Sequence, residues 1–141
     1  MISISEDPID VEMLLANVKD DFAGATILFL GTVRNHNADN VISAIYYEAY
    51  IKMAEEAMAK IEKEAIKRWN LKKFAAVHRI GNLKIGEVSV AIAVSSEHRT
   101  EAFGAGSYAI DRIKSEVPIW KKETISDKGE IWAQGTQMGG S

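Results

Sequence analysis

Cysteine is absent from this sequence, and so is any long apolar stretch. Without cysteine the chain cannot form disulfides, bind a metal through thiolates or use a cysteine nucleophile. No apolar run approaches the roughly 18 residues that a membrane span needs. The first ten residues, MISISEDPID, contain neither the basic nor the apolar segment of a signal peptide. We therefore expect a soluble, cytoplasmic protein that is not associated with a membrane.

The chain also has little net charge of either sign. It contains 17 basic and 20 acidic residues, which give a formal net charge of -3. This balance argues against binding nucleic acid through overall charge, although a local basic site could exist within an acidic surface. With 141 residues, of which 47% are hydrophobic, the sequence is typical of one globular domain. We expect a single domain over 1–135 and a flexible tail over 136–141.

Hydrophobic periodicity predicts an α+β fold. Apolar residues recur at helical spacing in three segments, which we expect to form helices over about 8–18, 53–69 and 100–116. Runs rich in β-branched and aromatic residues predict strands over 25–33, 41–50, 73–80 and 87–96, and a hairpin that joins 122–125 to 130–133. The expected architecture is a mainly antiparallel sheet covered by two or three helices.

Some local features refine this expectation. Asp7 is the expected N-cap of the first helix. The first two strands are expected to pair antiparallel across the polar loop 34–40. In the strand over 87–96, valine and isoleucine alternate with serine and alanine, so a helix should pack closely on the face with small side chains. Gly104 and Gly106 lie inside the third predicted helix, where we expect them to permit close helix packing.

The first polar cluster is GTVRNHN, residues 31–37, which follows a predicted buried strand. Arg34 and His36 should therefore stand where the sheet meets solvent. An arginine in this position is suited to clamping an anion, because its planar guanidinium matches phosphate and carboxylate. The alternative is an ordinary turn whose asparagines satisfy the backbone.

The second cluster is SSEHRTEAF, residues 95–103, at the start of the third predicted helix. The free amides and the dipole of a helix N-terminus attract anions, and His98 and Arg99 would strengthen that attraction. The alternative is that Ser96 or Thr100 caps the helix while the basic pair is solvated.

The third and fourth clusters are Lys114 and the stretch VPIWKKET, residues 117–124. Lys114 lies at the edge of the apolar stripe of the third helix, so its methylenes can pack on the core while its amine emerges. Partial desolvation there would lower its pKa and favour an acid, base or nucleophile. Pro118 ends the helix and should bring Lys121 close to Lys114, with Glu123 beside them. The alternative is a set of ordinary solvated lysines.

Other common chemistries have no signature in the chain. Neither a histidine pair at metal-ligand spacing nor a carboxylate cluster appears, so we expect no metal site. A phosphate-binding P-loop and a dinucleotide fingerprint are absent as well. His78 lies at the end of a predicted strand, and we expect it to be structural.

Six segments appear in an order that matches one known family. They are GTVRNHN, YYEAY followed by MAEEAM, HRIGNLKIGE, SSEHRTEAF, AIDRIK and PIWKKE. In this order they resemble the large, catalytic subunit of molybdopterin synthase, and the resemblance covers about residues 24–132. It implies an α/β hammerhead fold and a homodimer in which each subunit binds one small ubiquitin-like sulfur carrier, giving a heterotetramer.

The resemblance also implies a reaction and a site. Sulfur would pass from the carrier's C-terminal thiocarboxylate to cyclic pyranopterin monophosphate, forming the molybdopterin dithiolene, with no cofactor and no nucleic acid involved. The domain over 1–135 would then be catalytic. The implied catalytic residues are Lys114 and Lys121, and the implied substrate-binding residues are Thr32, Val33, Arg34, His98, Arg99, Lys122 and Glu123.

The chemistry of these side chains agrees with that function. The substrate phosphate and the thiocarboxylate are both anionic, so the site must be locally positive even in an acidic protein. Two other classes remain open at this point. The chain could be a scaffold that only docks a ubiquitin-like protein, or a phosphate-recognising RNA or nucleotide module.

Overall fold

The structure is a computed structural model, and it describes residues 1–37, 40–125 and 129–132. The tail predicted over 136–141 lies outside these ranges. The described residues form an α+β fold, as predicted. Its elements in chain order are β1 (Ile2–Ser5), α1 (Val11–Asn17), β2 (Ala25–Thr32), β3 (His36–Asn37), β4 (Asn40–Ala49), α2 (Ile51–Trp69), β5 (Lys73–Arg79), β6 (Gly81–Lys84), β7 (Val88–Ser96), α3 (Arg99–Glu116), β8 (Ile119–Ile125) and β9 (Gly129–Trp132).

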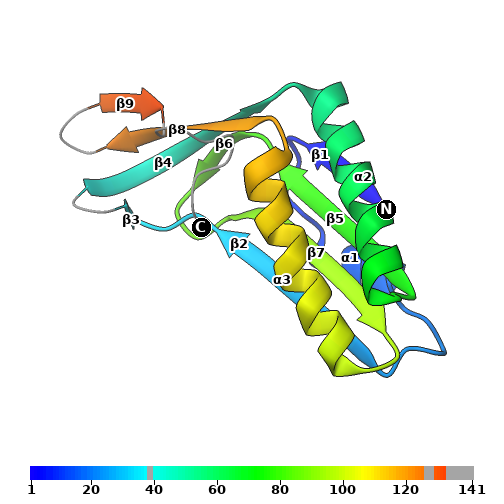
Figure 1. Cartoon of the computed structure of the whole chain (residues 1–141). Helices are drawn as coiled ribbons and strands as arrows, with labels where there is room; N and C mark the ends of the chain where they lie inside the picture. The colour runs from blue at the N-terminus through cyan, green and yellow to red at the C-terminus, as the bar shows by residue number, and fades with distance from the viewer. Residues whose placement is uncertain (38–39, 126–128, 133–141) are drawn as a thin grey trace.

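The first sheet has the strand order β1-β5-β7-β2. Its β1–β5 pair is parallel, while β5–β7 and β7–β2 are antiparallel. Helices α2 and α3 run side by side over one face of this sheet, and α1 covers the other face (Figure 1). The main core therefore lies between the sheet and the two long helices.

The second sheet contains β3, β4, β8 and β9 in that order, and β6 pairs with β4. It extends away from the C-terminal end of α3, and all of its strand pairs are antiparallel (Figure 1). The hairpin predicted at the end of the chain is confirmed as β8 and β9, in which Lys122 pairs with Trp132 and Ile125 with Gly129. None of the described helices is long and apolar enough to cross a membrane.

The alternating pattern of β7 has the predicted consequence. Its valine and isoleucine side chains belong to the core under α2 and α3. Ala91 and Ala93 lie on the opposite face and pack with Leu14 of α1 and with Val18, the C-cap of that helix. Small residues on this face let α1 approach the sheet, which closes a second core.

Two local predictions are wrong. The strands β2 and β4 do not pair with each other, because β2 pairs with β7 and β4 pairs with β8 and β6. The short segment between β2 and β3 carries the chain from the first sheet into the second. The first helix also begins later than predicted, since its N-cap is Asp10, whose side chain accepts the Met13 N–H at 3.0 Å. Asp7 instead accepts a hydrogen bond from Ser5.

Candidate active site

Strand β8 divides its side chains between two environments. Residues at alternate positions are buried, and among them Lys121 and Glu123 are each 4% exposed. The residues between them, Trp120 and Lys122, are half-buried on the other face. Because side chains alternate along a strand, the adjacent lysines point in opposite directions. Only Lys121 and Glu123 can contribute to a site on the core side of this sheet.

Lys114 approaches the same region from α3. It lies in the last turn of the helix and is half-buried, as its place at the edge of the apolar stripe predicted. The helix ends at Glu116, before Pro118, and β8 begins at Ile119. The short connection turns the chain directly from the helix into the strand, because the Ile119 N–H donates to the Val117 carbonyl at 2.8 Å. The predicted proximity of the end of the helix to the lysine pair is therefore explained by this tight turn.

Arg34 comes from a third segment, the exit of β2, and is exposed. The backbone on both sides of it is fixed. The Val33 N–H donates to the Glu87 carbonyl at 3.0 Å, and the Ile42 N–H donates to the Asn35 carbonyl at 2.7 Å. These bonds connect the segment to the start of β7 and to β4, so Arg34 is held between the two sheets.

These residues interact electrostatically with one another. Burial lowers the pKa of Lys121 below its ordinary value of 10.5, and the positive charges of Arg34 and Lys114 lower it further. The Glu123 carboxylate acts in the opposite direction and raises that pKa. Arg34, Lys114, Lys121 and Glu123 therefore form one group, which we call the lysine cluster. Its three cations outnumber its one carboxylate, so it attracts anions.

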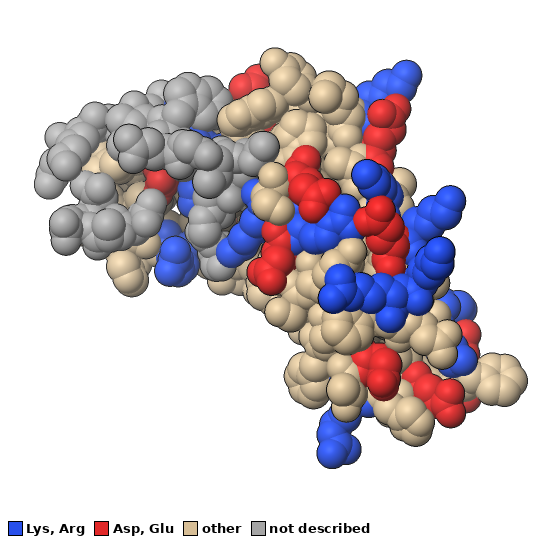
Figure 2. Space-filling model, in the orientation of Figure 1, with Lys and Arg blue, Asp and Glu red and all other residues tan. Residues whose placement is uncertain are grey.

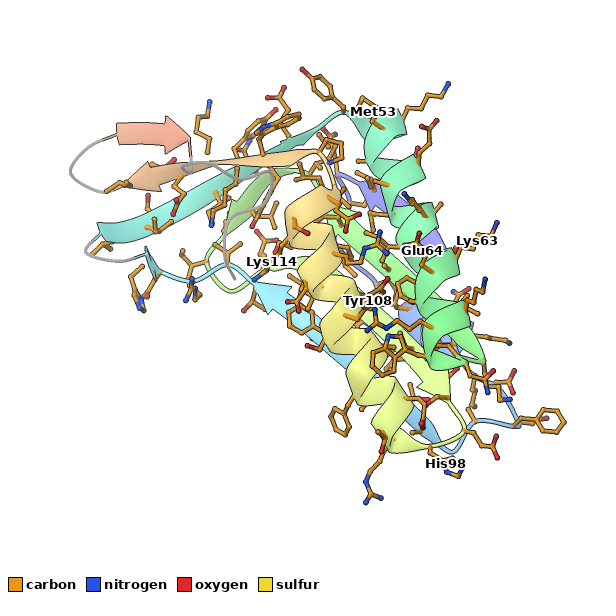
Figure 3. The ribbon with its side chains drawn as sticks, in the orientation of Figure 1. Met53, Lys63, Glu64, His98, Tyr108 and Lys114 are labelled. Atoms are coloured by element: carbon orange, nitrogen blue, oxygen red, sulfur yellow. The ribbon has the colours of Figure 1, made fainter. Side chains whose placement is uncertain are left out.

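His98 and Arg99 are not part of the lysine cluster within one chain. Both are exposed at the N-terminal end of α3, and the side chain of His98 is 76% exposed. Fifteen residues of helix separate Arg99 from Lys114, which corresponds to about 22 Å at 1.5 Å per residue. Figure 3 shows His98 and Lys114 toward opposite ends of α3.

The remaining predicted residues lie around the lysine cluster. Thr32 is exposed at the end of β2, whereas Val33 is 3% exposed and belongs to the main core. Lys122 lies on the opposite face of β8, with its Nζ 5.4 Å from the centre of the Tyr46 ring. Among the described residues, no group of three or more histidine, cysteine or carboxylate side chains could hold a metal ion.

Sequence reasoning missed Tyr47 as a neighbour of this site. Tyr47 is 2% exposed and lies directly opposite Lys121 in the β4–β8 register. The sequence pattern placed it in a strand, but only the pairing of β4 with β8 brings it next to the lysine. The sequence VISAIYYEAY did not distinguish the two adjacent tyrosines, and only the structure shows that Tyr47 is buried while Tyr46 is half-buried.

A hollow of about 460 Å³ lies on the other face of β8, away from the lysine cluster. Its described lining is Glu48, Ala49, Tyr50 and Trp120. The Tyr50 and Trp120 rings meet edge to face, with their centres 4.8 Å apart. This described lining is largely apolar and contains no cation.

The surface over α2 and α3 is mixed in charge. Figure 2 shows basic and acidic side chains interspersed along these helices. Arg112 connects the two helices, since it pairs with Glu64 of α2 and with Glu116 of its own helix. This face is therefore structural, and the concentration of buried charge at the lysine cluster stands apart from it.

Comparison with known proteins agrees with this arrangement. The profile of the family described as MoaE protein matches residues 4–116. The molybdopterin synthase catalytic subunit of Halalkalibacterium halodurans is 45% identical over 136 residues, covering 96% of this chain and 86% of that protein. The subunit of the same name from Pyrococcus abyssi is 38% identical, covering 95% of this chain and 91% of that protein.

Solved structures show the same fold. The crystal structure of molybdopterin synthase from Staphylococcus aureus matches with a TM-score of 0.83 and 40% identity, covering 98% of this chain and 96% of that chain. A complex of subunits 1 and 2 of molybdopterin-converting factor from Helicobacter pylori matches with a TM-score of 0.74 and 25% identity, covering 94% and 90%.

Together with the comparisons, the fold identifies an α+β enzyme whose lysine cluster lies where the two sheets meet. More particularly, the chain belongs to the MoaE family, the catalytic subunits of molybdopterin synthase, which act in molybdenum cofactor biosynthesis.

Proposed function

We propose that this chain transfers sulfur from the C-terminal thiocarboxylate of a small ubiquitin-like carrier to cyclic pyranopterin monophosphate, which yields the molybdopterin dithiolene. The observation that carries the proposal is the lysine cluster, in which Lys121 is almost fully buried beside Arg34 and Lys114. Burying cations in a protein is costly unless they are compensated. A site that must accept two anions at once supplies a reason for this excess of positive charge.

Each member of the lysine cluster has a proposed role. Arg34 would hold the substrate phosphate, for which the planar guanidinium is suited. Lys114 would be the general acid and base, both when the carrier's sulfur attacks the pterin and when water hydrolyses the resulting acyl intermediate. Lys121 would stabilise the negative charge that develops in these steps, and its lowered pKa makes its proton easier to release. Glu123 would orient Lys121.

Thr32, Val33 and Lys122 would complete the substrate contacts. Thr32 is exposed beside Arg34, so its hydroxyl is available to a ligand. Val33 has a buried side chain, and its N–H donates to the Glu87 carbonyl, so it would contribute by holding Thr32 and Arg34 in place. Lys122 faces away from Lys121, so we propose that it contacts the carrier rather than the pterin.

We further propose that the active unit is a homodimer. His98 and Arg99 are too far from Lys114 of the same chain to bind the same small molecule. A two-fold axis that sets two α3 helices antiparallel would bring Arg99 of one subunit toward Lys114 of the other. The exposed side chains of Leu30, at 39%, and Phe103, at 61%, support an interface on this side of the molecule.

The carrier is proposed as a second partner, giving a heterotetramer with two carriers. Support comes from the Helicobacter pylori structure, which contains subunits 1 and 2 of molybdopterin-converting factor. The absence of cysteine in this chain is consistent with sulfur that arrives on another protein.

Reconstitution tests the proposed function. The protein is mixed with a thiocarboxylated carrier and cyclic pyranopterin monophosphate, and the dithiolene product is measured. We expect Lys114→Ala to lower the rate by roughly 100-fold or more, because it removes the general acid and base. Lys63→Ala is the matched control, since Lys63 is exposed on α2 and should leave the rate unchanged (Figure 3).

The outcomes separate the candidate functions. Product formation by the wild type that is lost only in Lys114→Ala supports sulfur transfer. Carrier binding without pterin binding, measured by calorimetry, would instead identify a docking scaffold. Full activity in the Lys114→Ala variant would contradict the role given to that lysine.

A further inference from the structure

Ser96 is the last residue of β7 and stands just before the start of α3. Because side chains alternate along a strand, Ser96 shares the face of Ile92 and Val94, which is covered by α2 and α3. The residue is fully buried. A buried hydroxyl is costly unless it finds a hydrogen-bond partner, so the partner of Ser96 indicates what this serine contributes.

The partner is the carbonyl of His98, to which the Ser96 Oγ donates at 2.5 Å. The sequence left open whether Ser96 or Thr100 caps the helix, and the structure gives the N-cap position to His98. The carbonyl of an N-cap residue accepts the first hydrogen bond of the helix. The Ser96 hydroxyl therefore holds the oxygen atom from which the hydrogen bonds of α3 begin.

The segment before β2 restrains the same junction. The Gly24 N–H donates to the Ser96 carbonyl at 2.9 Å. The next carbonyl, that of Glu97, packs against Gly24 so closely that a Cβ added to the glycine would lie 2.4 Å from its oxygen. The backbone over 96–98 is thus restrained twice, by Gly24 and by the Ser96 hydroxyl.

The side chains of His98 and Arg99 take no part in this restraint. The His98 side chain makes no capping hydrogen bond, and its Nε2 lies 3.8 Å from the Glu97 Oε1, which is longer than a hydrogen bond. Arg99 is the first residue of α3 and is exposed. Both basic side chains therefore project into solvent from a backbone that other residues hold in place.

We propose that Ser96 is a positioning residue, whose hydroxyl fixes the direction in which α3 presents His98 and Arg99 to the anionic substrate. The inference rests on the proposed sulfur transfer and homodimer, in which this pair acts beside Lys114 of the other subunit. Ser96 is buried and does not touch the substrate. Loss of its hydroxyl should weaken substrate binding and leave the chemical step unchanged, because Lys114 and Lys121 lie at the other end of α3.

The test compares Ser96→Ala with Ser95→Ala in the reconstituted assay. Ser95 is the matched control, because it is equally buried but its Oγ has no hydrogen-bond partner among the described residues. We expect Ser96→Ala to raise the KM for cyclic pyranopterin monophosphate by about 5- to 10-fold, the scale of one hydrogen bond, and to change kcat less than about twofold. Ser95→Ala should change neither value by more than about twofold. A lower kcat with an unchanged KM in Ser96→Ala would indicate a merely structural serine and overturn the proposal.

Threonine and valine at position 96 separate the hydroxyl from the shape of the side chain. Both replacements are branched at Cβ and have similar volumes, so they disturb the core alike. Ser96→Thr keeps the donor, and its KM should be at least about 3-fold lower than that of Ser96→Val. Equal KM values in these two variants would overturn the proposal. Thermal unfolding of each variant checks that the fold persists.

A background without the basic pair shows whether Ser96 acts through it. In a chain that carries both His98→Ala and Arg99→Ala, adding Ser96→Ala should raise the KM no further, because the side chains that Ser96 positions are already absent. A KM that rises again by the same factor would overturn the proposal.

Hydrogen exchange gives a readout that does not depend on activity. The Ala102 amide is the donor to the N-cap carbonyl in an α-helix that begins at Arg99. It should exchange about 10-fold faster in Ser96→Ala and at the wild-type rate in Ser95→Ala. Equal exchange in Ser96→Ala and an active wild type would refute the positioning role alone. A wild type that makes no product would refute the proposed reaction, and with it the positioning role, whatever the exchange at Ala102.

Discussion

Lys121 and His78 are both buried and titratable, but their surroundings differ. Lys121 is buried with Glu123 beside it, so its charge is partly compensated. His78 is fully buried, and burial lowers its pKa from 6.5 to about 4, although its hydrogen bond to the Arg79 carbonyl acts in the opposite direction. It is therefore neutral at pH 7. A neutral, fully buried His78 contributes to packing, which is the structural role predicted for it. Lys121, in contrast, lies beside other charged groups.

The neutral His78 predicts a specific loss of stability in mild acid. In the unfolded chain this histidine gains a proton as the pH falls below 6.5, whereas in the folded protein it does so only near pH 4. The unfolded state thus binds more protons between these values. We expect His78 to lower the free energy of unfolding by about 2 kcal/mol between pH 7 and pH 5.

The matched variant is His78→Asn, which keeps an N–H donor for the Arg79 carbonyl but does not titrate in this range. Urea unfolding at pH 7 and pH 5 should show a smaller loss in the variant than in the wild type, even if the variant is less stable at both. The lowered pKa values of Glu87 and Glu116 act mainly below pH 5, so they do not obscure the comparison. Equal losses in both proteins would contradict the neutral state of His78.

At the residue scale, the sequence predicted which side chains carry charge into the site, but not which ones surround it. Lys114 was predicted from its angle on the helix, and Lys121 from its place just after Pro118. Tyr47 could not be predicted, because its contact with Lys121 depends on a strand pairing that spans more than 70 residues. His98 and Arg99 were predicted to strengthen an anion site at a helix start; the structure places them at that start, and their role in binding stays a prediction.

At the scale of elements, alternation and helical periodicity were sufficient to predict the helices and strands in which a hydrophobic pattern repeats. The β7 pattern predicted a helix on its face of small residues, and the β8–β9 hairpin followed from two short strands around a turn. The predicted pairing of β2 with β4 is wrong. The prediction relied on the tendency of consecutive strands to pair, and nothing in the local sequence marks these two strands as an exception to it. The chain crosses between the sheets before β3, and it is β3 that pairs with β4, through His36 with Val41 and Asn37 with Asn40.

The two glycines of α3 provide a test of helix packing. A Cβ added at Gly104 would lie 2.4 Å from the Trp69 ring of α2, whereas one at Gly106 would have Ile27 as its nearest neighbour at 3.7 Å. We expect Gly104→Ala to destabilise the protein by about 1–3 kcal/mol, because the two helices must separate. Gly106→Ala should be neutral or stabilise by up to about 1 kcal/mol, since alanine favours a helix.

Urea unfolding at one protein concentration measures both variants. Both glycines were expected to permit close helix packing. The geometry supports this role for Gly104, where the contact with the Trp69 ring leaves no room for a Cβ. If Gly104→Ala were as stable as Gly106→Ala, the Trp69 side chain would have to move aside at no cost, and the close approach of α2 and α3 would not depend on this glycine.

At the scale of the whole molecule, α3 acts as a spacer. Its C-terminal end carries Lys114 into the lysine cluster, and its N-terminal end presents His98 and Arg99 to solvent about 22 Å away. The helix cannot shorten this separation within one chain. The sequence alone does not reveal this separation. Two charged clusters can look equivalent along the chain, and only the helix length and the sheet topology together decide whether they lie close together or far apart.

The proposed homodimer resolves this separation, and mixing two inactive variants tests it. In a shared site, Arg99→Ala and Lys114→Ala homodimers each lack one group at both sites. A mixed dimer regains one complete site, which joins Lys114 of the Arg99→Ala chain to Arg99 of the Lys114→Ala chain. Equal mixing makes half of the dimers mixed, with one of their two sites complete, so about a quarter of the wild-type rate should return.

If each site were built from one chain, every chain in the mixture would still carry a defect, and no activity would return. Subunit exchange must be complete for this comparison, which a mass difference between the two variants can establish by native mass spectrometry. Activity that rises with the fraction of mixed dimers would place Arg99 across the subunit boundary from Lys114. An Arg99→Ala homodimer with full activity would exclude Arg99 from the site altogether, because the length of α3 leaves it no other route to the lysine cluster.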